Sequence, residues 1–342
     1  MLHRAADGPG ANMPRLVMLL RSRWPRFGIF VAACLLSLSA GRDSHPYASD
    51  QPMTEPKLFA EGVISTPFDE FGLTFTKDGR TVFFNRSVPR SNFYFICMST
   101  FRDGRWTEPE IAPFSGQYWD FDAVVSPDGS KMVFASDRPV PGHPKKDQDF
   151  DIWMVDKTAT GWSEPRHLDE AINSGQDETF ASLAANGTLY FVSGREGGRA
   201  GLAIYRSRLV NGRYQPAEKL KGSVNGPENW SLEVLVAPDE SFLFLVPLGR
   251  KDGYGSFDIY VSDQKNGEWT EPRNLGPKIN TAARDYSPRF SPDGKYLFWS
   301  SERGFEKPEN YRDLIAHERS TVNGWGNIYQ IDLTAIGLGE KR

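Results

Sequence analysis

Residues 287–301 read SPRFSPDGKYLFWSS. A short β-prone run leads into Pro-Asp-Gly, and four consecutive apolar residues, 296–299, follow the turn. Asp-Gly tolerates the positive φ angles that a tight hairpin turn needs, so this stretch predicts one β-hairpin. The architecture then depends on whether this hairpin occurs once or is repeated along the chain.

The hairpin pattern recurs four more times, each time with a β-run, a turn and a second β-run. The five copies occupy residues 71–86, 121–138, 179–195, 231–250 and 286–303. Four copies carry Asp-Gly or Asn-Gly at the turn. The copy at 231–250 has Asp239-Glu240 instead, and a different turn is expected there because Glu disfavours positive φ.

Two further strands follow each hairpin. The third strands are expected at 94–99, 150–156, 202–208, 257–263 and 326–332, and the fourth at 106–112, 162–168, 214–220 and 269–275. The last copy lacks a fourth strand, and TEPKLFA at 54–60 supplies one from the other end of the chain. This pattern predicts an all-β, five-bladed β-propeller with four antiparallel strands per blade, over residues 54–338, whose ring is closed by the N-terminal strand.

Two other architectures explain the sequence pattern less well. A six-bladed ring with one degenerate blade would need a leftover segment of about 50 residues, which is absent. A two-sheet sandwich would not need such regular four-strand units. The consecutive apolar residues of the second strands, such as 296–299, also indicate burial on both faces, which packing between two neighbouring blades provides.

The repeat has a recognisable consensus, S-P-D-G-K-x-L-F-x-S-S-x-R followed by D-I-Y and by W-x-E-P-x-N-L-G. It resembles the TolB-type β-propeller repeat, which is WD-repeat-like, of exported bacterial proteins. The resemblance covers residues 54–338 and implies a periplasmic or secreted binding scaffold with no agreed catalytic residues. TolB itself carries a separate α/β domain before its propeller, for which this chain is expected to have no room, so a role in the Tol–Pal system does not transfer.

Composition and the N-terminal pattern narrow the class of protein. Arg15, Arg21, Arg23 and Arg26 precede the apolar run at 28–40, and GRDSHP follows it. This pattern predicts a signal peptide over residues 1–41 and export to the periplasm or beyond. Val31–Cys34 is similar to a lipobox, but apolar residues follow the cysteine, so cleavage is favoured over lipidation. The net charge of −4 excludes a nucleic-acid footprint. No metal or cofactor motif is present, and a monomer that does not span the membrane is expected.

Charged residues recur at fixed places around the hairpins. Eight residues before each turn Asp or Asn stand Glu70, Asp120, Glu178, Ser231 and Asp285, and eight to eleven residues after it stand Arg86, Arg138, Arg195, Arg250 and Arg303. Residues equidistant from a hairpin turn lie opposite each other, so acids and arginines are expected at the same end of the hairpins. Because the first strand of a propeller blade is innermost, this end is one mouth of the central channel.

These residues have a structural and a functional interpretation. In the structural one, which the repetition favours, Arg86, Arg138, Arg195 and Arg303 pair with the acids and pin the strand ends. In the functional interpretation, the mouth binds a ligand, and residues that depart from the repeat are candidates for contacting it. Ser231 replaces an acid and leaves Arg250 without the usual partner. Asp122 and Glu233 are additional acids. The candidate ligand-binding residues are Glu70, Asp120, Asp122, Glu178, Trp230, Glu233, Asp285 and Arg250. Aromatic residues beside them suit either a ligand or core packing.

Two loops between second and third strands are long, 139–150 and 304–325, and are expected at the same mouth. The second contains YRDLIAHERS, which predicts a short helix over the mouth. Two functions follow. The first is a non-catalytic exported scaffold that binds a protein, peptide or glycan at the channel mouth. The alternative is a glycoside hydrolase or lyase that uses mouth carboxylates, although pairing with arginine is expected to lower their pKa values and spoil a general acid.

Overall fold

The computed structural model describes residues 45–339 except 88–92, 141–148, 198–200 and 227–230. The predicted signal peptide and Trp230 therefore lie outside the described residues. Among the described residues, no helix has the length and apolar character needed to cross a bilayer.

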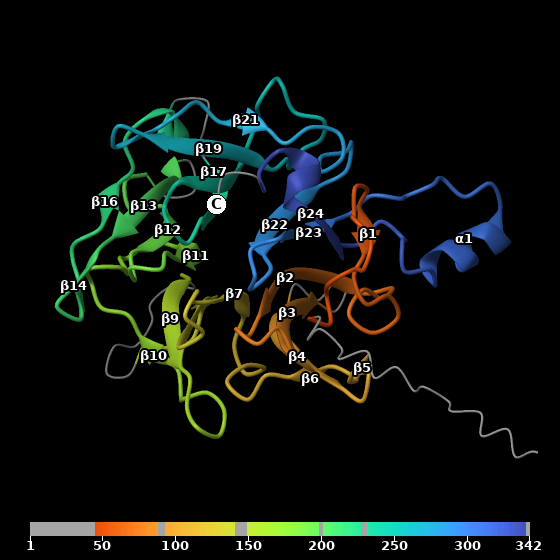
Figure 1. The fold of residues 1–342 in the computed structure, drawn as a ribbon, viewed down its shortest axis with the longest axis horizontal. Coiled ribbons are helices and arrows are strands. Elements are labelled where there is room, and N and C mark those ends of the chain that lie inside the picture. Colours follow the sequence, from red (N-terminus) through yellow and green to blue (C-terminus); the bar gives the residue numbers. More distant parts are fainter. Residues whose placement is uncertain (1–44, 88–92, 141–148, 198–200, 227–230, 340–342) are drawn as a thin grey trace, which may run out of the picture. The chain divides into compact units, whose positions relative to one another are not determined.

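Five antiparallel sheets form a five-bladed β-propeller, as the repeat predicts (Figure 1). The innermost strands surround the centre of the ring in Figure 1. They are β2 (Asp69–Phe75), β7 (Asp120–Val125), β11 (Glu178–Leu183), β17 (Ser231–Val236) and β22 (Asp285–Phe290). The second strands are β3 (Thr81–Ser87), β8 (Lys131–Ser136), β12 (Leu189–Ser193), β18 (Phe242–Pro247) and β23 (Tyr296–Ser301).

The third strands are β4 (Tyr94–Arg102), β9 (Asp151–Asp156), β13 (Ala203–Ser207), β19 (Tyr260–Lys265) and β24 (Asn327–Asp332). The outer strands are only two residues long: β6 (Glu110–Ile111), β10 (Arg166–His167), β16 (Glu218–Lys219), β21 (Arg273–Asn274) and β1 (Lys57–Leu58). Such short outer strands leave little sheet edge exposed. The remaining elements are β5 (Arg105–Trp106), β14 (Leu209–Val210), β15 (Arg213–Tyr214), β20 (Glu268–Trp269), the helix α1 (Tyr311–Glu318) and 3₁₀ turns at Ser223–Asn225 and Leu333–Ile336.

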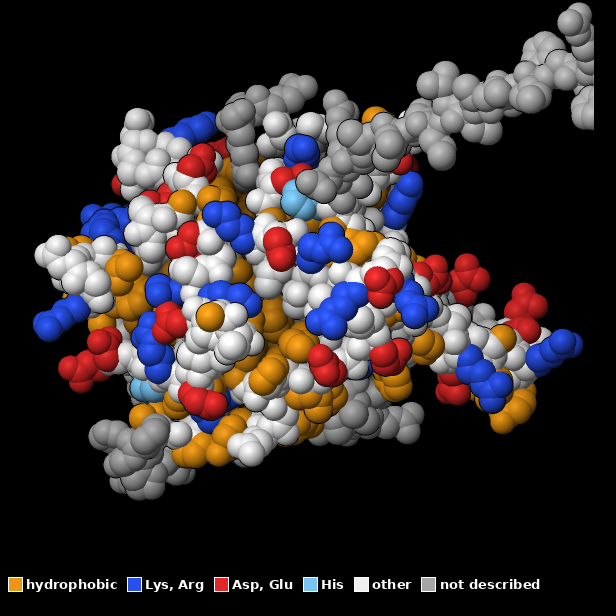
Figure 2. Space-filling model, turned by 60° about the horizontal axis from the view of Figure 1, so that its bottom comes forward, with side chains coloured by type: hydrophobic (Ala, Val, Ile, Leu, Met, Phe, Trp, Pro, Cys, Tyr) orange, Lys and Arg blue, Asp and Glu red, His pale blue; other side chains and the backbone are white. Residues whose placement is uncertain are grey.

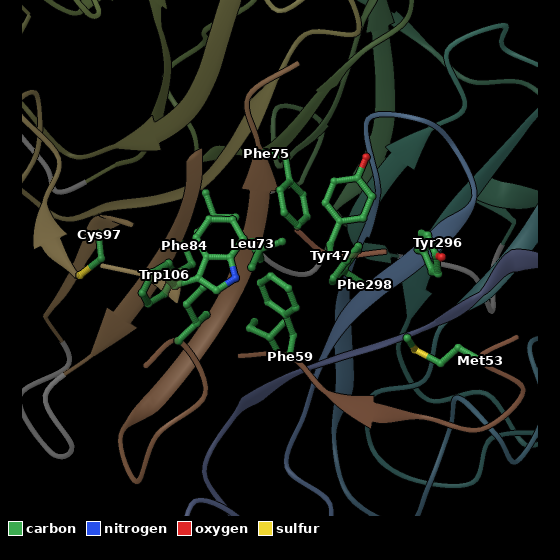
Figure 3. Packing of buried hydrophobic residues seen from close by; sticks show 13 residues of the cluster. Tyr47, Met53, Phe59, Leu73, Phe75, Phe84, Cys97, Trp106, Tyr296 and Phe298 are labelled. Carbon is green, nitrogen blue, oxygen red and sulfur yellow. The ribbon is translucent and has the colours of Figure 1, made fainter. Parts of the chain in front are cut away.

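The N-terminal segment closes the ring. Strand β1 pairs with β24, so that Lys57 lies opposite Gln330 in the sheet of blade five. The residues before and after β1 pack between blades five and one (Figure 3). Tyr47 contacts Phe75 of β2 at 4.8 Å between ring centroids, and Phe59 contacts Phe298 of β23 at 5.2 Å. The segment therefore joins the last blade to the first through both a sheet and an aromatic cluster.

Blades pack on one another through their second strands. Every residue of β18 and of β23 is buried, as expected for a strand covered on both faces. Leu297 and Trp299 of β23 share one cluster with Phe244 and Val246 of β18, between blades five and four. At about 25 cal/mol per Å² of apolar surface buried, such interfaces dominate the stability of the ring.

The turn of blade four has the same shape as the other four, which corrects the expectation of a different turn. Glu240 has φ +59°, and its N–H donates to the carbonyl of Ala237 at 2.9 Å. The glycine of the blade-one turn, Gly79, has φ +68° and makes the equivalent bond. The Glu240 carboxylate accepts hydrogen bonds from Asn186 and from the Tyr190 hydroxyl of blade three, each at 2.7 Å. These bonds between blades offset the cost of the left-handed conformation.

All five inner strands carry a β-bulge at the same place, where two of their residues oppose one residue of the second strand. The bulged pairs are Gly72–Leu73, Asp122–Ala123, Phe180–Ala181, Leu232–Glu233 and Ser287–Pro288. The first residue has positive φ in four blades, between +49° and +63°, but not at Leu232 of blade four. A bulge redirects the side chains of its strand, so blade four presents different residues to the channel.

The blade-five insert does form a helix, α1, capped at its start by the Asn310 side chain. However, Figure 1 shows α1 at the outer side of blade five, beyond β1, and not over the mouth as expected. The end of the insert returns to the channel, where Trp325 lines the mouth. Nearby, Asn323 donates to the Pro67 carbonyl at 2.9 Å. Most of the blade-two loop lies outside the described residues. Figure 2 shows positive and negative side chains interspersed over one face of the molecule.

Candidate ligand-binding site in the central channel

The repeated acids are paired with the repeated arginines and are inaccessible to solvent. Glu70, Asp120, Glu178 and Asp285 are each 0% exposed. The ion pairs are Arg86–Glu70 (3.0 Å), Arg138–Asp120 (2.6 Å), Arg195–Glu178 (3.4 Å) and Arg303–Asp285 (2.9 Å). A bond from a Ser or Thr side chain four or five residues earlier also reaches each acid, as Thr281 does to Asp285 at 2.8 Å.

The same arginines also bind the chain that enters each blade. Arg138 donates to the carbonyl of Phe114 at 3.0 Å, and its Nε donates to Ser136 Oγ at 2.9 Å. Arg195 and Arg303 repeat both contacts with their own blades. Only Arg86 lies directly opposite its acid in the sheet; the other three acids lie opposite a serine, with the arginine two residues further on. This arrangement fixes the inner strand of each blade to the preceding connection.

Burial raises the pKa values of Glu70, Asp120 and Glu178, contrary to the expectation that arginine would lower them. The pKa of Glu70 rises to about 8 because desolvation outweighs Thr66 and Arg86. The pKa values of Asp120 and Glu178 are also raised by burial. These groups do not line the cavity described next, so their raised pKa values do not make them accessible acids.

Arg250 of blade four has taken other partners. Its guanidinium binds Asp252 at 2.8 Å and Glu271 at 2.7 Å, both of them exposed acids. Ser231, at the acid position, is buried and donates its hydroxyl to the carbonyl of Glu233 at 2.8 Å. Blade four therefore lacks the common ion pair.

A funnel-shaped cavity of about 480 Å³ opens at the channel mouth. We call it the funnel. Every inner strand contributes an apolar or aromatic residue next to its bulge or within it, and these residues are Phe71, Phe121, Phe180, Leu232 and Tyr286. Four of the five are aromatic. The cavity is thus built by all the blades but is not symmetric, because Leu232 of blade four is the exception.

Six aromatic side chains of the funnel form a chain of ring contacts, which we call the aromatic collar. In order around the mouth they are Phe180, Phe121, Tyr94, Phe71, Tyr286 and Phe257. Successive ring centroids lie 5.8, 6.4, 5.4, 6.3 and 6.2 Å apart. The collar begins on blade three and ends beside blade four, and Leu232 and Glu233 occupy the gap.

Glu233 lies in this gap, and a buried ion pair lies next to it. Glu233 is 6% exposed and accepts bonds from Ser287 N–H at 2.7 Å and from Ser287 Oγ at 3.2 Å. Asp122 of blade two is 0% exposed and binds Arg289 of blade five at 2.8 Å. Burial and the nearby Asp122 carboxylate raise the pKa of Glu233 to about 8, and burial raises that of Asp122 to about 6. Burial and the Asp122 carboxylate therefore both favour the protonated form of Glu233 in the empty cavity.

The Asp122–Arg289 pair separates the funnel from the opposite mouth. Arg289 lines a second cavity of about 110 Å³ on that side, while Glu233 lines the funnel. Asp122 Oδ2 and Arg289 Nε have no hydrogen-bond partner among the described residues. Gly72 is adjacent, and a Cβ there would lie 3.0 Å from Asp122 Oδ1. The centre of the channel is thus closed by charged side chains in close contact.

The rim of the funnel holds further charged groups. Arg284 Nε donates to Glu302 at 2.8 Å, and the Arg284 guanidinium lies 5.5 Å from the Phe257 ring centroid. Asp69 accepts from Ser87 Oγ at 2.9 Å and from Gly326 N–H at 3.0 Å. Burial raises the pKa values of Asp69 and Glu302. Within the described residues, no group of three or more His, Cys, Asp or Glu side chains has the arrangement of a metal site.

Of the predicted candidates, the structure places Glu233 in the funnel and Asp122 beside it. Sequence reasoning missed Arg289 and the aromatic collar. Arg289 was visible as a cation within the inner strand at 287–290, where the other blades have uncharged residues. The collar was visible in part as an aromatic residue directly after the acid in blades one, two and five.

The comparisons with known proteins do not identify a function for this chain. No protein-family model matches the sequence, and no curated protein matches it. Among solved structures, TolB from Acinetobacter baumannii is 16% identical, with a TM-score of 0.46 over 78% of this chain and 54% of that chain. A protein of unknown function from Dyadobacter fermentans is 14% identical, with a TM-score of 0.45 over 72% and 79% of the two chains. An oligogalacturonate lyase from Vibrio parahaemolyticus is 14% identical, with a TM-score of 0.40 over 78% and 66%. The chain spans about half the length of the TolB chain, and no argument is drawn from these low TM-scores.

Proposed function

We propose that this protein is a non-catalytic binding protein and that its ligand enters the funnel at the acid-bearing mouth of the channel. The observation that carries the proposal is the funnel itself. Its volume of about 480 Å³ lies in the range of small-ligand sites, and it combines many aromatic side chains with few polar ones. The portion that enters is a side chain, a terminus or a sugar unit of a peptide, protein or glycan.

Export to the periplasm or the extracellular space belongs to this proposal. It is supported by the basic and apolar pattern at residues 1–41 and by the resemblance of the repeat to that of TolB-type proteins. We propose that the protein acts as a monomer, with no cofactor. The arginine-paired acids Glu70, Asp120, Glu178 and Asp285 then serve the scaffold, and the funnel residues serve the ligand.

A funnel-filling variant tests the proposal. Leu232→Trp places a large side chain at the gap in the collar, whereas Val210→Trp places the same side chain at an exposed site on β14. The wild type and both variants are screened by thermal shift against peptides, oligosaccharides and small metabolites from the envelope of the source cell. We expect a ligand that raises the melting temperature of the wild type and of Val210→Trp but not of Leu232→Trp. If every ligand acts equally on Leu232→Trp, or none acts on the wild type, the proposal is wrong.

A glycoside hydrolase or lyase is the second candidate, and one observation favours it. Glu233 lines the funnel with a pKa of about 8, and a carboxyl that keeps its proton at neutral pH is what a general acid requires. A partner carboxylate would have to be Asp69 or Glu302, which already bind Ser87 and Arg284. Sustained release of products from an oligosaccharide by the wild type, lost in Glu233→Gln, would establish this function and overturn the non-catalytic one.

A further inference from the structure

We infer that the group bound in the funnel is an organic ammonium cation, which the Glu233 carboxylate and the aromatic collar recognise together. The inference rests on the proposed binding function and names the chemistry of its ligand. It follows from the shape of the collar, from the charges around the funnel and from the partners of Glu233.

The collar provides the aromatic surface. Six rings follow one another around the mouth at centroid separations of 5.4 to 6.4 Å, so an entering group meets aromatic carbon on most sides. Aromatic rings attract cations through their quadrupole, and an ammonium group within about 6 Å of several rings is held in an aromatic cage. Arg284, near Phe257 on the rim, already uses the collar in this way.

The lining of the funnel has more acidic than basic side chains. Its lining includes three acids, Asp69, Glu233 and Glu302, against one base, Arg284. Arg284 is occupied by Glu302. Arg289 does not fill the deficit, because its guanidinium binds Asp122 at 2.8 Å and it lines the opposite cavity. Asp69 and Glu233 are thus the two acids of the lining whose hydrogen-bond partners, within the described residues, are uncharged.

Glu233 is the group that needs a counter-ion. It is more than nine-tenths buried, and its hydrogen-bond partners within the described residues are the N–H and the hydroxyl of Ser287, which carry no charge. A buried carboxylate without a cation is costly, so the empty funnel favours the protonated acid. An ammonium group that stacks on the collar would supply the counter-ion and release this proton.

This exchange makes binding dependent on pH. The charged and titratable groups around Glu233 are Asp122 on β7 and Arg289 and Tyr286 on β22. Because the pKa of Glu233 in the empty protein is about 8, the ionised form that binds a cation is scarce at pH 6 and predominant at pH 9. Asp122 titrates lower, with a pKa of about 6, and keeps its ion pair with Arg289 at pH 9. The affinity for a permanent cation therefore rises between these two pH values.

Choline and 3,3-dimethylbutan-1-ol are a suitable pair of probes. The two molecules have the same shape, but the alcohol has an uncharged carbon atom where choline has its quaternary nitrogen. The charge of choline does not change with pH. Dissociation constants are measured by ligand-observed NMR at pH 6 and pH 9. For the wild type we expect choline to bind at least tenfold more tightly than the alcohol at pH 9, and at least tenfold more tightly at pH 9 than at pH 6.

The variants separate the two parts of the site. Glu233→Gln keeps both hydrogen bonds to Ser287 and removes the charge, so the preference for choline and the pH dependence should disappear. Phe121→Leu should weaken choline binding at least threefold at both pH values. Glu268→Gln, at an exposed acid on β20, is the matched control and should behave as the wild type. Melting curves establish that each variant is folded.

A second pair of probes identifies the source of the ammonium group. Nα-acetyl-lysine methylamide carries a primary ammonium, and acetylation of its side chain removes the charge. Tighter binding of the charged lysine probe than of choline points to a peptide ligand, and the reverse points to a quaternary ammonium ligand. Equal binding of the charged and neutral members of both pairs, or no binding of any probe, overturns the inference. An uncharged ligand that Leu232→Trp excludes would overturn it too, but would leave the binding function intact.

Discussion

Arg289 of blade five forms an ion pair with Asp122 of blade two across the centre of the ring, at 2.8 Å, although 167 residues separate them in the chain. Both side chains are buried, and the pair joins blades that are not neighbours in the order of the chain. It lies below the funnel and neutralises Asp122, whereas the hydrogen-bond partner of the Glu233 carboxylate among the described residues is the uncharged Ser287. Arg289, a cation on an inner strand, thus contributes to the asymmetry of the site.

Breaking this pair should be costly, and removing both charges should cost less. Arg289→Met leaves the Asp122 carboxylate buried without a cation, and we expect a loss of about 3–5 kcal/mol in the free energy of unfolding at pH 7. The double variant Arg289→Met/Asp122→Asn should recover much of the loss, because Asn tolerates the positive φ of +55° at this position. Urea denaturation measures both. A single variant within about 1 kcal/mol of the wild type would show that the pair is not a stabilising contact.

The stability of the empty protein should fall between pH 5 and pH 8, and Glu233 should account for part of the decline. Its pKa is about 8 in the folded protein and near 4.3 in the unfolded chain, so the folded state holds the proton that the unfolded state releases. The contribution is fully present below about pH 4.3 and disappears as the pH rises through 8. Each pH unit between these two pKa values lowers the free energy of unfolding by about 1.4 kcal/mol.

Denaturation of the wild type, Glu233→Gln and the control Glu268→Gln at pH 5, 6, 7 and 8 measures this contribution. The decline should be shallower in Glu233→Gln alone, since Glu70 contributes to it in all three proteins. Parallel curves for all three would contradict the raised pKa of Glu233.

Gly326→Ala should damage the funnel locally. A Cβ at this position would lie 2.6 Å from the Tyr286 hydroxyl and 2.7 Å from Asp69 Oδ1. We expect a loss of about 1–3 kcal/mol from overpacking, together with weaker binding of any ligand that enters the funnel. Gly175→Ala is the control, because nothing lies within 4 Å of its Cβ position. If Gly326→Ala has the same melting temperature and ligand affinity as this control, the contacts around Tyr286 are looser than in the structure.

The turn of blade four offers a test of backbone strain. Glu240→Ala removes the bonds to Asn186 and Tyr190 but keeps a non-glycine residue at φ +59°, whereas Glu240→Gly removes the same bonds and relieves the strain. We therefore expect the alanine variant to be less stable than the glycine variant by about 1 kcal/mol in chemical denaturation. Equal stabilities would mean that the turn relaxes to another conformation in the variants.

Much of the fold was predictable because it repeats. Five copies of a hairpin with correct turn residues, and a fourth strand found at the N-terminal end, lead to a closed ring without further information. The turn at Glu240 was mispredicted because residue preferences for turns consider only the turn itself. The cost of the positive φ at Glu240 is offset by hydrogen bonds to Asn186 and Tyr190 of the neighbouring blade.

The candidate site was only partly predictable, since it depends on departures from the repeat. Asp122 and Glu233 stood out as extra acids, but their partners Arg289 and Ser287 lie on another blade, and a sequence does not reveal contacts across a ring. The bulges were also hidden, although they decide which side chains face the channel. The pKa shift of Glu70 was predicted in the wrong direction because desolvation of a fully buried carboxyl outweighs its arginine.

The inferred site for a cation lies between the aromatic collar and Glu233. A crystal of the protein grown at pH 9 and soaked with tetramethylarsonium, a permanent cation that contains a strong anomalous scatterer, tests it most directly. We predict one anomalous peak inside the funnel, between the collar rings and the Glu233 carboxylate, that is absent from crystals of Glu233→Gln. An empty funnel in wild-type crystals, or an equal peak in Glu233→Gln, would show that Glu233 and the collar do not bind a cation together.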